Sequence, residues 1–157
     1  GKLDILVGNA GILGEITPIP QIEPDDWQEL IKVNLTANWQ LIRSLQSLLL
    51  ASDSGRAMFV TSGVAGGRAY WGGYAITKTA LESMVKTWAE EMAGTSLKIN
   101  LINPGAVRTA MRASAYPGEN PMSLPKPEEI TEVFVKLGEH TCLFHSRTVN
   151  AENYNNF

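Results

Sequence analysis

The chain has 157 residues, of which 44% are hydrophobic and 18% charged, a composition typical of one globular domain with a single buried core. A formal net charge of -3 gives no basic surface for a phosphate backbone, which argues against nucleic acid as a partner and favours a small molecule. The lone cysteine, Cys142, has no disulfide or zinc-binding pattern around it, and no apolar run approaches the roughly 20 residues of a membrane span. We therefore expect a cytoplasmic protein without a metal site.

Hydrophobic periodicity and turn residues predict strands that alternate with helices. Pro24 followed by Asp25 and Asp26 is typical of a helix start, because proline loses no hydrogen bond in the first turn and carboxylates meet the positive end of the helix dipole. The alternation predicts an α/β fold, a doubly wound, Rossmann-like parallel sheet covered on both faces. In chain order we expect strand 3–7, helix 24–50, strand 57–60, helix 74–93, strand 97–102, a loop rich in Pro, Gly and Ser over 105–125, helix 127–138 and a short strand 147–149.

Polar or glycine-rich clusters follow each of the first three expected strands. They are residues 9–11, 61–63 and 103–105. In an open α/β sheet, ligands bind outside the carboxyl ends of the strands. Each cluster alone is ordinary turn chemistry, but three at one edge of a sheet indicate a binding site.

Tyr74 and Lys78 stand four residues apart at the start of the expected helix 74–93 and are therefore neighbours on one helix face. That face also carries the apolar stripe of the helix, and a lysine is rarely buried without a partner or a cavity beside it. An isolated pair of this kind is more often a core tyrosine with a lysine that reaches solvent. The functional interpretation gains weight from Ser62 at a strand end and from Asn34, a polar residue within the apolar stripe of the preceding helix.

Together these features resemble the classical short-chain dehydrogenase/reductase family. The matching motifs occur in the family's order and at its usual separations over about the first 110 residues. They are Asn9-Ala10-Gly11, Val33-Asn34, Thr61-Ser62, Tyr74-Ala75-Ile76-Thr77-Lys78, and Asn103-Pro104-Gly105 followed by Thr109.

The resemblance implies an NAD(P)-dependent oxidoreductase that interconverts a carbonyl and a secondary alcohol by hydride transfer. Tyr74 would be the general acid/base, while Lys78 would favour its phenolate and bond the nicotinamide ribose. Ser62 would orient the substrate oxygen, and Asn34 would hold a water in the proton relay behind the lysine. We expect only a structural role for Asn38.

The resemblance also implies contacts with NAD or NADP at two places, beside the adenine ribose and beside the nicotinamide. The loop over 105–125, which we call the lid segment, matches the family's variable substrate lid. Apolar substrate contacts in it are expected from Met111, Tyr116 and Met122. The implied cofactor contacts are Asn9, Ala10 and Gly11 on the adenine-ribose side, and Tyr74, Lys78, Pro104, Gly105, Val107 and Thr109 on the nicotinamide side.

The family's glycine-rich phosphate loop lies upstream of the Asn9 motif, and no segment of this sequence matches it. Gly63, Gly66 and Gly67 follow the second expected strand and lead to no helix at the right distance. We therefore expect residues 1–157 to be one domain, the C-terminal half and tail of a longer dehydrogenase, with an apolar sheet edge at strand 3–7. The substrate and the choice between NAD and NADP are not determined by this sequence.

Two other functions are compatible with parts of the pattern. The chain could be a catalytically silent module that acts through association, since the two long helices often build dimer interfaces in the family. For the enzyme, the same helices make a homodimer or homotetramer the expected assembly. A hydrolase with Ser62 as nucleophile is disfavoured, because the serine lacks a G-x-S-x-G turn and no motif links it to His140 or His145, which we expect at the surface.

Overall fold

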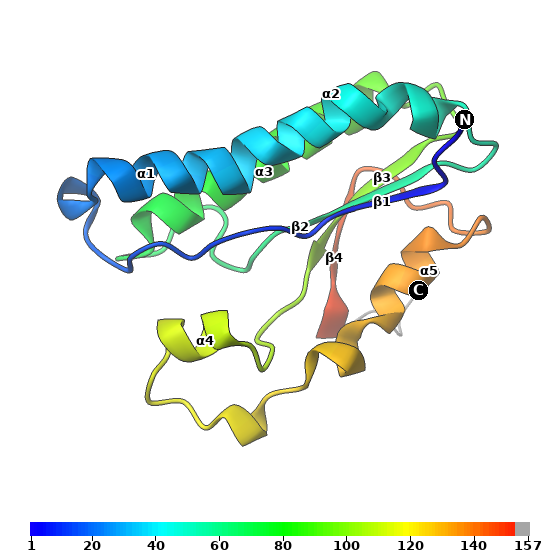
Figure 1. Ribbon diagram of the computed structural model, residues 1–157. Helices are drawn as coiled ribbons and strands as arrows, with labels where there is room; N and C mark the ends of the chain where they lie inside the picture. The colour runs from blue at the N-terminus through cyan, green and yellow to red at the C-terminus, as the bar shows by residue number, and fades with distance from the viewer. Residues whose placement is uncertain (153–157) are drawn as a thin grey trace.

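The computed structural model describes residues 1–152, in which four parallel strands form one sheet in the order β1-β2-β3-β4. Helices lie on both faces of this sheet (Figure 1). The α/β prediction is confirmed, and each predicted strand end lies within two residues of the observed one. The strands are β1 (Ile5–Gly8), β2 (Arg56–Val60), β3 (Lys98–Asn103) and β4 (Arg147–Asn150).

One face of the sheet is covered by two long helical segments that contact each other (Figure 1). The first joins α1 (Pro24–Leu30) to α2 (Ala37–Leu50) through a π-helical turn, η2 (Ile31–Thr36), and the second is α3 (Gly72–Glu91). The rings of Phe59 and Trp88 meet edge to face in the apolar cluster beneath them, with centroids 6.3 Å apart. Other buried members of this cluster are Leu6, Ile42, Leu81, Val85, Ile99 and Leu101.

The opposite face carries α5 (Glu132–Gly138), which follows a 3₁₀ turn, η4 (Pro127–Ile130). Arg56 at the start of β2 anchors the end of this helix. Its buried guanidinium donates hydrogen bonds to the carbonyl oxygens of Glu139 at 3.1 Å, His140 at 2.9 Å and Cys142 at 3.2 Å. These carbonyls belong to the segment just after α5, so Arg56 ties the end of the helix to the sheet.

The lid segment is more ordered than the sequence indicates. The prediction of a loop was wrong over α4 (Ala110–Ala115) and over the 3₁₀ turn η3 (Pro121–Ser123). A first 3₁₀ turn, η1 (Ile19–Gln21), lies before α1. Thr109 begins α4, because its hydroxyl accepts a hydrogen bond from the N–H of Arg112 at 3.1 Å. In Figure 1 this segment lies off the sheet, apart from the strands.

At the other side of the sheet, β1 pairs only with β2 within the described residues. Leu6 is buried, whereas Ile5 and Val7 are 47% and 41% exposed. This is the apolar edge that the sequence predicts, and such edges favour pairing with a further strand. None of the helices over residues 1–152 is both long and apolar enough to cross a membrane.

Replacing Arg56 by methionine should weaken the attachment of α5, because the carbonyls after the helix lose their donors. We expect the free energy of unfolding to fall by about 2–4 kcal/mol, measured by urea denaturation. Arg147→Met is the matched control, since Arg147 is exposed and its replacement should stay within about 0.5 kcal/mol. Equal losses in the two variants would contradict this role of Arg56.

Candidate active site

Tyr74 and Lys78 lie together on the first turns of α3, and both are buried, with 8% and 3% of their surface exposed. The Lys78 ammonium donates a hydrogen bond of 2.8 Å to the carbonyl of Val60, the last residue of β2, and lies 5.8 Å from the centroid of the Tyr74 ring. Gly73 allows α3 to begin so close to α1, because a Cβ at this position would stand 2.5 Å from a methyl carbon of Leu30. The helix phase expected from the sequence is therefore observed.

Ser62 joins this pair from the end of β2. Its hydroxyl lies close enough to the phenol of Tyr74 to oppose the rise in the pKa of that phenol. The preceding residue, Thr61, fixes the strand end, because its N–H donates to the carbonyl of Ile102 at 2.8 Å and its hydroxyl donates to the Glu82 carboxylate at 2.8 Å. The structure thus brings Ser62, Tyr74 and Lys78 together at one edge of the sheet.

Asn34 connects the loop after β1 to α3. Its side chain is fully buried, accepts from the N–H of Ile12 at 2.8 Å and donates to the Ile12 carbonyl at 2.9 Å and the Thr77 hydroxyl at 3.1 Å. Thr77 in turn donates to the main-chain carbonyl of Tyr74 at 2.9 Å. Asn34 is therefore linked through the Thr77 hydroxyl to the main chain of Tyr74.

A π-helical turn surrounds Asn34, and the N–H of Ala37 bonds to the carbonyl of Lys32, five residues back. Such turns are rare and recur at functional sites. Asn38, the other polar residue of the stripe, is buried and donates its side-chain amide to the carbonyl of Asn34 at 2.9 Å. This contact agrees with the structural role expected for Asn38.

Burial shifts both titrating groups of the site towards their neutral forms. It raises the pKa of the Tyr74 phenol above its usual value, and the hydrogen bond with Ser62 opposes this shift. It lowers the pKa of the Lys78 ammonium from 10.5 to about 8. At neutral pH the phenol is consequently protonated, while the lysine still carries most of its charge.

The residues expected beside the nicotinamide leave room for a hydroxylated ligand next to Lys78. Within residues 1–152 the ammonium has one hydrogen-bond acceptor, the Val60 carbonyl, although it carries three donors. Gly11 adds space, since a Cβ there would lie 3.4 Å from Nζ of Lys78 and 3.5 Å from Oδ1 of Asn34. A ribose fits this chemistry, because its hydroxyls are acceptors for the remaining N–H groups.

The other implied cofactor residues differ in how they are placed. Asn9 and Ala10 are exposed after β1, and Gly105 is exposed after β3. Pro104 is half-buried and Val107 is buried. Thr109 is already engaged: besides capping α4, its hydroxyl lies 3.4 Å from the carbonyl of Val107. A bond that Thr109 donates to a carboxamide or diphosphate oxygen would therefore replace the contact with Val107 and leave the cap of α4 in place.

The glycines between Ser62 and Tyr74 form a turn, as expected, rather than a phosphate cradle at a helix N-terminus. Gly66 and Gly67 have φ angles of +94° and +106°, which other residues rarely adopt. The N–H of Gly66 donates to the Thr79 hydroxyl at 2.7 Å. This N–H is not available to a phosphate, and α3 begins only at Gly72.

Sequence reasoning missed three features near these residues. No role was expected for Thr77, yet its hydroxyl accepts a hydrogen bond from the side chain of Asn34. Trp71, three positions before Tyr74, packs against the tyrosine ring at a centroid distance of 5.9 Å. His145 was wrongly expected at the surface: it is half-buried, and its ring nitrogens lie 2.8 Å from the Ala89 carbonyl and 3.3 Å from the Ile99 N–H. These contacts are at the far end of α3 from Tyr74, which gives Ser62 no histidine base there.

Comparison with known proteins agrees with this geometry. The family model of the short chain dehydrogenases matches residues 1–120. The uncharacterized oxidoreductase YciK of Escherichia coli K12 is 43% identical over 137 residues, which are 87% of this chain and 54% of YciK. A solved short chain dehydrogenase from Salmonella enterica serovar Typhi superposes with a TM-score of 0.93 at 41% identity, over 96% of this chain and 63% of that one.

A further solved short chain dehydrogenase, from Escherichia coli CFT073 and complexed with NADPH, has a TM-score of 0.92 at 40% identity. It also matches 96% of this chain and 63% of its own length. The chain belongs to the short-chain dehydrogenase family. It spans between about half and two thirds of the length of these relatives.

Replacing Lys78 by methionine should change how the free energy of unfolding depends on pH, because it removes a buried charge. The lysine titrates near 10.5 when unfolded and at about 8 when folded, so between these values the unfolded chain binds more protons. Wild-type stability should therefore rise relative to Lys78→Met as the pH increases, by about 2 kcal/mol between pH 8 and 10. Denaturant titrations at several pH values measure this difference.

Lys86→Met is the control for this experiment, because it removes the same charge from a side chain that is 49% exposed. A stability difference between wild type and Lys78→Met that stays constant over the same pH range would overturn the assignment.

Proposed function

We propose that the protein containing this chain is an NAD(P)-dependent oxidoreductase that interconverts a carbonyl and a secondary alcohol. The observation that carries the proposal is the buried phenol of Tyr74, flanked by the Ser62 hydroxyl and the Lys78 ammonium. A proton donor, a hydrogen-bond donor and a cation around one point are what the reduction of a carbonyl requires. NAD or NADP supplies or accepts the hydride when bound.

In reduction, Tyr74 donates its phenolic proton to the substrate oxygen while the carbonyl carbon receives the hydride. Ser62 donates a hydrogen bond to the same oxygen and orients it. The phenolate left on Tyr74 is stabilised by the charge of Lys78. Because burial raises the pKa of Tyr74, the phenol is in its proton-donating form at neutral pH, which favours the reducing direction. Oxidation runs through the same atoms in reverse.

Asn34 is proposed to help return a proton to the site through a water. Both amide hydrogens of its side chain are occupied by Ile12 and Thr77. A relay water would therefore donate to one of the oxygen atoms of Asn34 rather than accept from it. We assign Pro104, Gly105 and Val107, together with Lys78, to the nicotinamide side of the cofactor, and Asn9 and Ala10 to the adenine-ribose side. Gly11 was expected on the adenine-ribose side, but its proximity to the Lys78 ammonium moves it to the nicotinamide side in this proposal.

The phosphates of the cofactor need a loop that residues 1–152 do not supply. We propose that it lies in an upstream part of a longer polypeptide, which the coverage of the relatives supports. The lone, half-buried thiol of Cys142 suits a cytoplasmic location, which is part of the same proposal. The mass of the intact protein measures directly how much chain precedes the Asn9 motif.

Tyr74→Phe should abolish turnover, because the ring remains and only the transferable proton is lost. We expect the rate of NADPH or NADH oxidation with a carbonyl substrate to fall by about 10²–10⁴-fold, while circular dichroism and enhancement of cofactor fluorescence stay as in the wild type. Tyr70→Phe, at a tyrosine that is 64% exposed, is the matched control. If the wild type turns over no carbonyl substrate and its rate equals that of Tyr74→Phe, the proposed reaction is wrong and association remains as the function.

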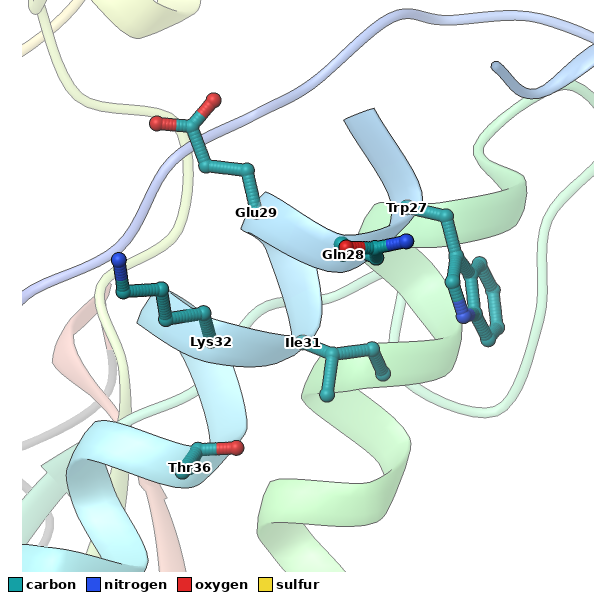
Figure 2. A pocket seen from close by; sticks show the side chains of 6 residues that line it. All are labelled: Trp27, Gln28, Glu29, Ile31, Lys32 and Thr36. Carbon is teal, nitrogen blue, oxygen red and sulfur yellow. The ribbon is translucent and has the colours of Figure 1, made fainter. Parts of the chain in front are cut away.

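A second copy of the chain is the proposed partner of the outer face of the long helices. A groove of about 580 Å³ runs along α1 and η2, lined by Trp27, Ile31 and Thr36 among others. In Figure 2 the indole of Trp27 lies on one side of the helix, and the charged ends of Glu29 and Lys32 lie on the other. A second hollow of about 510 Å³ joins Trp39 to Met84 on α3. The two hollows place apolar side chains on the outer face of both helical segments. A symmetric dimer would bury this face of each copy against the same face of the other.

Trp39→Glu should weaken this self-association, because the mutation replaces a large, 46% exposed apolar side chain by a carboxylate that the dimer would have to desolvate. We expect the dimer dissociation constant to rise more than about tenfold, measured by sedimentation velocity. Gln40→Glu adds the same charge at the next exposed residue and should leave association unchanged. A wild type that sediments as a monomer at every concentration refutes the proposed interface.

A further inference from the structure

Three aromatic rings form a continuous row from the candidate active site at the carboxyl ends of the strands to the lid segment. The rings of Tyr74 and Trp71 have centroids 5.9 Å apart, and those of Trp71 and Tyr116 are 5.7 Å apart. Trp71 is the residue before α3, and Tyr116 is the residue after α4. The row therefore connects two elements that are distant in the sequence, and its inner end is the proposed proton donor.

The position of Trp71 is fixed by its backbone. It forms a parallel β-bridge with Thr17 in the loop after β1, and its carbonyl accepts the first helical bond from the N–H of Ala75 at 2.7 Å. Tyr70, just before it, has a φ of 70°, a left-handed conformation that is rare for an aromatic residue and persists only where surrounding contacts enforce it. The indole is consequently presented in one orientation beside Tyr74.

Tyr116 is fixed from within the lid segment. The guanidinium of Arg112 lies 3.8 Å from the centroid of its ring. The same guanidinium forms two hydrogen bonds of 2.6 Å with the carboxylate of Glu119. Because one cation holds both the ring and the carboxylate, α4 and the turn after it are folded onto each other.

The two ends of the lid segment are also bonded to each other. Arg108 donates its main-chain N–H to the carbonyl of Pro125 and its guanidinium to the carbonyl of Leu124, both at 2.9 Å. Tyr116 is thus held against Trp71 by contacts at both ends of the segment that carries it.

The surroundings of this row are apolar. Val64, Tyr74 and Ala75 form a buried cluster with Leu13, Trp71 and Met111 around it. The two guanidinium groups nearby are on the ring faces: Arg112 is committed to Glu119, and Arg68 lies 5.9 Å from the Trp71 centroid at an exposed position. Met122, expected among the lid contacts, is 73% exposed and does not belong to this cluster.

We propose that Trp71 and Tyr116 form an aromatic clamp that selects substrates in which a flat ring adjoins the reacting carbonyl or alcohol. The inference rests on the proposed function, because it places the ring of the substrate against Trp71 while its oxygen meets Tyr74. A flat ring gains offset or edge contacts with both side chains, whereas an open-chain substituent of the same size covers less of either face.

The clamp is tested in the complete protein with two ketones, acetophenone as the flat ring and 2-butanone as the open chain. Leucine replaces each clamp residue in turn, Trp71→Leu and Tyr116→Leu, so that apolar volume is kept and the aromatic face is lost. The ratio of kcat/KM for acetophenone to kcat/KM for 2-butanone should fall about tenfold in each variant. Trp71→Phe and Tyr116→Phe should restore most of the ratio, because a ring remains.

A purely structural role makes a different prediction. In that case the leucine variants would lower both kcat/KM values equally together with the thermal midpoint, and their ratio would stay within about twofold of the wild type. This result, or phenylalanine variants that lose as much as the leucine variants, overturns the clamp.

Binding without turnover separates the clamp from the proposed reaction. A saturable rise of the wild-type thermal midpoint with acetophenone, lost in Trp71→Leu and kept in Trp71→Phe, supports the clamp even where neither NADH nor NADPH is oxidised, and then only the reaction is wrong. A wild type that reduces 2-butanone but neither binds nor prefers acetophenone overturns the clamp and leaves the reaction standing.

Discussion

The buried side-chain amide of Asn34 is the interaction on which the geometry of the candidate site depends. It bonds both main-chain groups of Ile12 and the hydroxyl of Thr77, so the loop after β1 and the first turns of α3 move together. A buried amide left without partners costs about 1–3 kcal/mol, which penalises any shift of one segment without the other. The place of Lys78 beside Gly11, and with it the burial that lowers the pKa of the lysine, follows from this link.

Features that depend on neighbouring residues could be predicted from the sequence. Pro24 and its two aspartates begin α1 where expected, and the helical segment ends at Leu50 as predicted. The short apolar run 57–60 identifies β2, because this strand is buried on both sheet faces. The four-residue spacing of Tyr74 and Lys78 fixes their common helix face once the helix is recognised. These inferences need no knowledge of distant contacts.

Features that depend on distant contacts could not be predicted. The π turn around Asn34 exists with bonds to Ile12, which lies 22 residues away in the chain. The prolines and glycines of the lid segment indicate a loop, although the hydroxyl of Thr109 suffices to begin α4. Trp71 and Tyr116 look like two unrelated core aromatics until the fold brings their rings together. No periodicity in the sequence records such pairings.

The closure formed by Arg108 has a consequence for how the family can diversify. Its two bonds, to Leu124 and Pro125, bring the ends of the lid segment together without using any residue between them. Lengthening a loop whose ends are already joined costs little chain entropy, about 0.6 kcal/mol for each doubling of its length. The residues between these ends can therefore be exchanged as a unit, which changes the side chains packed in the cluster of Tyr74, such as Met111, while the sheet and its register stay the same.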